Sequence, residues 1–121
     1  MLNSSLDAIE TFEVTDPTQI DAASRDYIAT VKIKMYKTLN NVSVHGYITW
    51  AKTAFTSNMS LFVVPWAHIE SVDVEFPIAV DKSSGGTTTY GFLRASTGFF
   101  VINGANVGTS TVRFNFSYVT K

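Results

Sequence analysis

Cysteine is absent from this chain of 121 residues. The chain therefore contains no disulfide, no thiolate nucleophile and no cysteine-ligated zinc or iron–sulfur site. Charged residues are scarce as well, at 16% against the roughly 25% of an average globular domain. Serine and threonine, which together number 27, supply the surface polarity instead. With aromatic residues at 13%, this low charge density predicts a folded domain rather than a disordered chain.

Long apolar runs are also missing. No run approaches the roughly 20 residues that a membrane-spanning helix needs, and no membrane partner is expected. Residues 1–5 include neither a basic region nor an apolar region, so no signal peptide is expected. The length fits one domain that can bury a hydrophobic core without needing cross-links such as disulfides. Because the chain begins within a linker-like segment, we expect Met1 to be the start of an excised piece.

Acidic charge is concentrated at the N-terminal end. Residues 1–28 hold six acidic residues and one basic residue, whereas residues 29–121 hold eight basic and four acidic residues. This change of sign predicts an acidic neck or linker over 1–28 and a folded body over 29–121. Asp16 followed by Pro17 is typical of a helix N-cap, and a short helical turn is expected over residues 19–25. The basic residues of the body are scattered, which does not favour a nucleic-acid partner.

The body shows the two-residue alternation of half-buried strands. This alternation covers residues 30–50, where Asn40 and Asn41 favour a tight turn between the two strands of one hairpin. Later strands are predicted over residues 60–64, 72–76, 87–95, 99–102 and 112–119. About seven short strands at this spacing predict an all-β fold, an antiparallel β-sandwich or barrel.

Local signals set the expected ends of these strands. Pro65 and Pro77 are each expected to end a strand, because proline lacks the backbone N–H that a sheet ladder uses. Asn103 followed by Gly104 is typical of a hairpin turn. Residues 82–86 are rich in serine and glycine and predict a flexible tip.

The order of certain segments resembles a known family. The segments are Gly46-Tyr47-Ile48-Thr49-Trp50, Leu61-Phe62-Val63-Val64-Pro65, Gly98-Phe99-Phe100-Val101-Ile102 and, close to the chain end, Phe116-Ser117-Tyr118-Val119-Thr120. With a glycine-rich tip between the second and third, they are similar to the C-terminal head domains of tail receptor-binding and baseplate proteins from tailed phages of lactic acid bacteria. The resemblance covers about residues 30–121 and consists of loose patterns rather than a signature.

The resemblance implies a homotrimeric head at the tip of a phage tail fibre or baseplate. Such a head is exposed to the host cell and recognises a saccharide of the bacterial cell wall or surface. Residues 1–28 would be the remains of a neck that joins the head to other tail or baseplate proteins. One departure stands out: the loop after Pro65 runs Trp66-Ala67-His68-Ile69-Glu70, without the glycine and the basic or proline residues usual there. No binding residue of the family is therefore carried over.

Motifs of known enzyme chemistry are missing, and we expect no enzyme activity, no cofactor and no metal. His45 and His68 stand 23 positions apart, and nothing in the sequence brings them together with carboxylates as metal ligands. Asp73 and Glu75 are two apart in a predicted strand and share a face. Two such carboxylates can flank a glycosidic bond. A solvated strand face, or acceptors for sugar hydroxyls or for a neighbouring subunit, explains them as well.

Saccharide binding needs a flat apolar surface for the C–H face of the ring and polar groups for its hydroxyls. Trp66, with His68 beside it, is the preferred platform, although it can equally be a core plug under the barrel end. Asp73 and Glu75 would accept hydroxyl protons. Tyr90 and Arg94 share a strand face, where the guanidinium could hold a phosphate or carboxylate or make a structural contact. Core positions are expected for Trp50, Phe114, Phe116 and Tyr118.

The function predicted from the sequence is a phage receptor-binding head domain that adsorbs to a cell-surface saccharide. It would be a binding module, a trimer whose several weak sites act together through avidity. Two alternatives stay open. One is a carbohydrate-binding module or adhesin domain of a larger protein, and the other is a purely structural baseplate or fibre component. Enzyme activity is the least favoured of these alternatives.

Overall fold

A computed structural model describes residues 9–52, 57–67, 72–81, 87–104 and 110–120. Two short helical segments, η1 (Pro17–Gln19) and α2 (Ala22–Arg25), lie between the first two strands. The strands are β1 (Glu10–Val14), β2 (Ile28–Thr38), β3 (Asn41–Trp50), β4 (Asn58–Val63), β5 (Val74–Asp81), β6 (Thr87–Leu93), β7 (Phe99–Asn103) and β8 (Thr111–Val119). The predicted glycine-rich tip at 82–86 lies outside the described residues.

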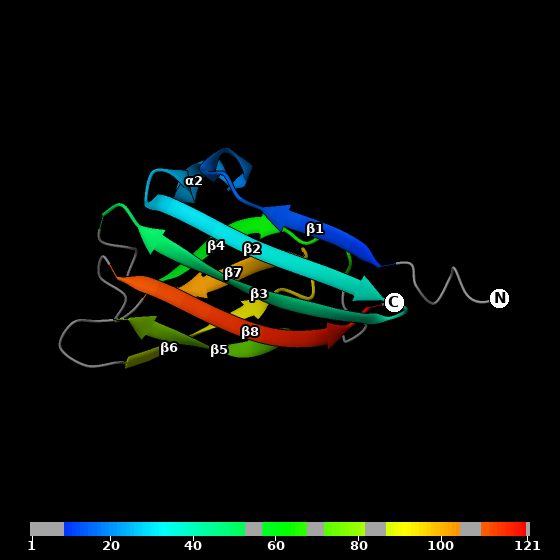
Figure 1. The fold of residues 1–121 in the computed structure, drawn as a ribbon. Coiled ribbons are helices and arrows are strands. Elements are labelled where there is room, and N and C mark those ends of the chain that lie inside the picture. The colour runs from blue at the N-terminus through cyan, green and yellow to red at the C-terminus, as the bar shows by residue number, and fades with distance from the viewer. Residues whose placement is uncertain (1–8, 53–56, 68–71, 82–86, 105–109, 121) are drawn as a thin grey trace.

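The strands form one antiparallel sheet in the order β1-β2-β3-β8-β5-β6-β7-β4. The sheet curls so that β1, β2, β3 and β8 lie in front of β4, β5, β6 and β7 in Figure 1. Its two edge strands, β1 and β4, approach each other. The centroids of the Phe12 ring on β1 and the Phe62 ring on β4 are 6.0 Å apart. The all-β antiparallel prediction is confirmed, and the described residues form one strand more than the seven or so expected from the sequence.

The two halves of the sheet are joined over a short length. β8 pairs with β3 over residues 111–119 but with β5 only over residues 111–113, which face β5 residues 79–81. Pro77 lies in the part of β5 that pairs with β6 but not with β8. The prediction that Pro77 ends its strand is wrong, because a proline is tolerated where its missing N–H would face an unpaired edge.

The acidic N-terminal segment takes part in the fold over residues 9–28. β1 pairs with β2, and Val14 and Ile20 are fully buried in the core. The expected N-cap is confirmed: Asp16 accepts from the backbone N–H of Thr18, which lowers the pKa of the Asp16 carboxyl. Over these residues the segment is part of the sheet and core rather than a free linker. Its role as a neck that joins a larger particle stays a prediction.

The η1–α2 segment covers the edge of β4. The backbone N–H of Asp21 donates to the carbonyl of Leu61 at 2.7 Å, and the Ser24 hydroxyl donates to the carbonyl of Ser60 at 2.9 Å. These bonds occupy acceptors that an edge strand would otherwise leave open. The segment therefore fills the gap between the two edges of the curled sheet.

Two predicted turns have different outcomes. The hairpin expected over 30–50 is confirmed as β2 and β3, joined by Leu39 and Asn40. Leu39 adopts a φ of 57°, a conformation that favours glycine or asparagine. The hairpin signal at Asn103 and Gly104 is wrong, because β7 pairs with β4 and β6, whereas β8 pairs with β3 and β5. A local turn motif does not overcome the packing that places β7 and β8 in opposite layers.

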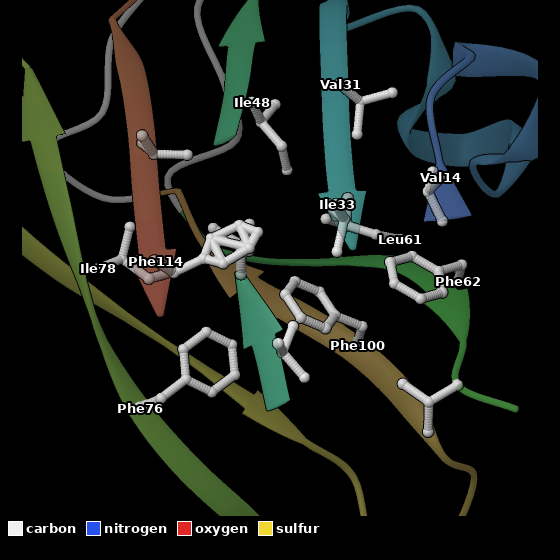
Figure 2. Packing of buried hydrophobic residues seen from close by; sticks show 14 of the residues in the cluster. Val14, Val31, Ile33, Ile48, Leu61, Phe62, Phe76, Ile78, Phe100 and Phe114 are labelled. Carbon is white, nitrogen blue, oxygen red and sulfur yellow. The ribbon is translucent and has the colours of Figure 1, made fainter. Parts of the chain in front are cut away.

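Aromatic rings fill the space between the layers. Figure 2 shows the fully buried ring of Phe100 between those of Phe62 and Phe76, with centroid distances of 5.1 and 5.3 Å. Where β5 and β8 diverge, the rings of Phe76 and Phe116 stack with centroids 3.8 Å apart. The core positions predicted for Trp50, Phe114 and Tyr118 are confirmed, and Phe116 is partly buried against the same cluster.

Neither helical segment that the structure describes has the length and apolar character that a membrane span needs.

Candidate functional site

The outer face of the β5–β6 hairpin brings two predicted site residues together. The register places Glu75 opposite Phe92 and Pro77 opposite Tyr90. Along β5, exposed residues alternate with the buried Phe76 and Ile78, so Glu75 and Pro77 face outward. Residues that pair across antiparallel strands share a face, which puts Tyr90 beside them. The alternation predicted over residues 72–76 is confirmed only from Val74 onward, because β5 begins there. Val72, expected to point inward, is 65% exposed, and the prediction that Asp73 shares a strand face with Glu75 is wrong because Asp73 lies outside the strand.

Two further predicted residues lie at the end of the same hairpin. Asp73 precedes β5, and its carboxylate accepts from the backbone N–H of Ala95 at 2.9 Å. Arg94 follows β6 and holds its guanidinium 5.1 Å from the centre of the Phe92 ring. Asp73 therefore has a structural task, tying the start of β5 to the turn after β6. Arg94 lies over the ring of Phe92, which is buried although its register places it on the outer face, and the guanidinium can still present donors to a ligand.

A shallow depression lies between Glu75 and Tyr90. It has a volume of about 330 Å³, and its lining is Glu75, Phe76, Pro77, Thr88, Thr89 and Tyr90. The Tyr90 residue is 43% exposed, and its hydroxyl accepts from Asn103 Nδ2 at 3.3 Å. Glu75 accepts no hydrogen bond from the residues that the structure describes. The depression thus combines an exposed aromatic ring with a carboxylate that is available to a ligand.

Trp66 lies elsewhere, near the last residues of β8. Its ring is partly buried against the core, and its carbonyl accepts from the Tyr118 hydroxyl at 2.7 Å. Burial raises the pKa of Tyr118 well above its usual range. Packing of Trp66 on the core agrees with the alternative interpretation of this residue as part of the core. Its use as a platform for a sugar ring stays a prediction. His68, expected beside it, lies outside the described residues.

A second depression lies on the other side of β5. It is a groove of about 370 Å³ where β5 and β8 diverge, and its lining is Pro77, Ile78, Ala79, Thr88, Arg113, Phe114 and Asn115. It shares Pro77 and Thr88 with the depression beside Tyr90. This groove could not be predicted from the sequence, because it depends on which distant strands become neighbours. The only signal was alternation, which places Arg113 and Asn115 on the polar face of the last strand.

Three ion pairs lie among the charged groups that the structure describes. Arg113 Nε donates to Asp81 Oδ2 at 2.9 Å, and Lys34 lies 3.5 Å from Glu13, whose charge raises the pKa of Lys34. In the part of the chain that the structure describes, no group of three or more histidine, aspartate or glutamate side chains could hold a metal ion.

Comparison with known proteins gives a match in structure. No family model matches the chain, and no curated protein matches its sequence. The fold is similar to the crystal structure of the receptor binding protein (gp15) of Listeria phage PSA, with a TM-score of 0.59 and 14% sequence identity. The match covers 94% of this chain and 66% of that chain. At this identity the likeness shows a shared fold, which spans nearly the whole of the present chain.

Proposed function

We propose that this chain is the head domain of a phage receptor-binding protein and that it binds a saccharide on the host cell surface during adsorption. The observation that supports this proposal most directly is the likeness of fold, over 94% of the chain, to the receptor binding protein of a Listeria phage. The family resemblance of the sequence points to the same class of protein. The host group, predicted as lactic acid bacteria, is part of the proposal.

The outer face of the β5–β6 hairpin is the proposed contact surface. Tyr90 offers an exposed ring for the C–H face of a sugar, and Glu75 offers a free acceptor for its hydroxyls. Arg94 at the end of the hairpin adds donors. A shallow open site of this kind binds each sugar weakly. We therefore propose a homotrimer, in which several sites act together through avidity.

The proposal places the protein in the virion, at the tail tip or baseplate, in contact with other tail proteins. The proposal is one of binding without a chemical reaction: the described part of the contact surface offers an exposed ring, the Glu75 carboxylate and the Arg94 guanidinium. The alternatives are a carbohydrate-binding module or adhesin domain of a larger protein and a purely structural baseplate or fibre component. The structural component would ignore cells and glycans, whereas the module would bind glycans as a monomer.

The test is binding of the fluorescently labelled chain to purified cell walls. Walls from several lactic acid bacteria and from Listeria are used untreated, after protease digestion and after periodate oxidation, which destroys sugars with vicinal hydroxyls. We expect binding to walls of at least one host that survives protease and is lost after periodate. Binding that is lost after protease, or no binding to any untreated wall, would contradict the proposal.

A further inference from the structure

We propose that the binding surface continues across β5 into the groove between β5 and β8, where Arg113 binds an acidic group of a polysaccharide. The acidic group is a phosphate or a carboxylate carried by the sugar chain. This inference rests on the proposed function and adds to it the chemical class of the ligand and a residue, Arg113, that the sequence did not single out.

The groove exists because the sheet opens at this place. β5 and β8 are paired at residues 79–81 and 111–113 and diverge beyond them. Inside the molecule the stacked rings of Phe76 and Phe116 fill the widening gap. On the outside the gap leaves a trough whose accessible lining is almost entirely apolar. Such a trough can cover the C–H face of a sugar ring while its rim contacts the hydroxyls.

The Arg113 side chain is held at the rim in a defined orientation. Its Nε donates to Asp81 Oδ2 at 2.9 Å, and its guanidinium carbon lies 5.8 Å from the centre of the Tyr47 ring. Its two terminal nitrogens donate to no other residue that the structure describes. An exposed ion pair of this kind contributes little stability. What the pair provides is an arginine whose remaining N–H groups are oriented and available, in the planar geometry that matches carboxylate and phosphate oxygens.

The local charge also suits an acidic ligand. Asp81 balances Arg113, but Lys32 lies in the same transverse row of the sheet, two strands away across Tyr47. Lys32 is exposed and has no carboxylate within ion-pair distance among the described residues. The outer face of β8, β3 and β2 beside the groove therefore keeps a positive charge that attracts an anion.

The two depressions fit one extended ligand. They share Pro77 and Thr88, and Tyr90 on β6 is separated from Arg113 on β8 by the width of β5. Strands are spaced by about 4.8 Å, and the register places Tyr90 two residues along β6 from Thr88, the residue in the same row as Arg113. The backbone positions of Tyr90 and Arg113 therefore stand about 12 Å apart. An oligosaccharide spans this distance and a single sugar ring does not. The ligand would place a neutral ring on Tyr90 and an acid-bearing unit at Arg113.

The test is a nuclear magnetic resonance titration of the ¹⁵N-labelled chain with three probes: methyl glucoside, glucose 1-phosphate and glucuronic acid. We expect the two acidic sugars, or one of them, to shift the backbone amides of Ala79, Thr88 and Asn115. A response to glucose 1-phosphate alone identifies a phosphate-bearing polymer, and a response to glucuronic acid alone identifies a uronic acid polymer. Either outcome supports the proposal.

Variants distinguish a specific role of the Arg113 side chain from a general effect of positive charge. Arg113→Gln should weaken the response to acidic sugars by about tenfold or more, the loss expected for a charged hydrogen bond. Arg113→Lys should recover part of it, because the charge remains but the planar fork is lost. Lys37→Gln is the control, since it removes a half-buried cation that pairs with Glu10 at the far edge of the sheet. The side chain of Arg113 is 59% exposed, so its variants should fold normally.

Two results would overturn the inference: no groove amide responds to an acidic sugar, or the response is unchanged in Arg113→Gln. The wall-binding assay keeps this failure distinct from failure of the proposed function. If the wild-type chain binds periodate-sensitive walls and Arg113→Gln binds them equally, only the acidic-group inference is wrong. If the wild-type chain binds no walls, the proposed function itself is wrong.

Discussion

Replacing Phe100 by alanine should cost this domain a large part of its stability. The ring is fully buried, and its centroid lies within 5.3 Å of the centroids of Phe62, Phe76 and Phe114, which come from both layers of the curled sheet. Removing a buried phenylalanine costs about 3 to 5 kcal/mol, and loss of these ring contacts places Phe100 near the upper value. A domain of this length is stable by about 6 to 18 kcal/mol, so the variant should still fold.

Urea denaturation followed by tryptophan fluorescence measures the loss. The control is Phe99→Ala, because Phe99 precedes Phe100 on β7 but is only partly buried and faces the outer surface beside Val63. We expect the control to lose less than about 1.5 kcal/mol. If Phe100→Ala loses about as little as the control, the two layers do not share one core and the packing argument is refuted.

Three further predictions concern the turn, a buried hydroxyl and the assembly. Leu39→Gly should raise the stability by about 0.5 to 1 kcal/mol, seen as a higher melting temperature, because glycine accepts the positive φ. Burial raises the pKa of Tyr118, so the unfolded chain releases that proton first, and the stability should fall as the pH rises above about 10. Urea denaturation of the wild type and of Tyr118→Phe, below and above that pH, measures this change in stability. The stability of the variant should fall less than that of the wild type, because phenylalanine has no proton to release. Light scattering should give a mass near three times 13.3 kDa, whereas the mass of one chain would contradict the trimer.

Alternation in the sequence was enough to predict most strands. In the hairpin of β2 and β3, apolar residues such as Val31, Ile33 and Ile48 point into the core and are buried, while His45 lies on the exposed face. The period of two follows from strand geometry alone and needs no knowledge of which strands pair. The all-β class could therefore be predicted from the sequence.

Pairing between distant strands could not be predicted in the same way. Pro77 was expected to end a strand, but it is accommodated because β8 has already diverged at that point. Asn103 and Gly104 lie at the end of β7, whose partners are on the opposite side of the core from β8. β1 was missed because its five residues show weak periodicity, and its pairing with β2 spans the η1–α2 segment.

The candidate site was predictable in part for the same reason. Glu75 and Tyr90 were chosen for their chemistry, and the register of β5 and β6 places them on one face. Arg113 could not be chosen, because its place at the groove depends on a contact between β8 and a strand more than thirty residues earlier. Trp66 was chosen for its loop position, yet its packing on the core became visible only with the Tyr118 hydrogen bond.

The most direct test of the account compares wall binding by the wild type, Tyr90→Ala and Tyr36→Ala. Tyr36 is the matched control, a partly exposed tyrosine that contacts His45 on the outer face of the other layer. Loss of one ring contact should weaken binding about 2- to 10-fold at each site, and avidity in a trimer should enlarge the effect. The account predicts weaker binding to periodate-sensitive walls for Tyr90→Ala and wild-type binding for Tyr36→Ala. Equal binding by the wild type and by a folded Tyr90→Ala would contradict the placement of the site on the β5–β6 face.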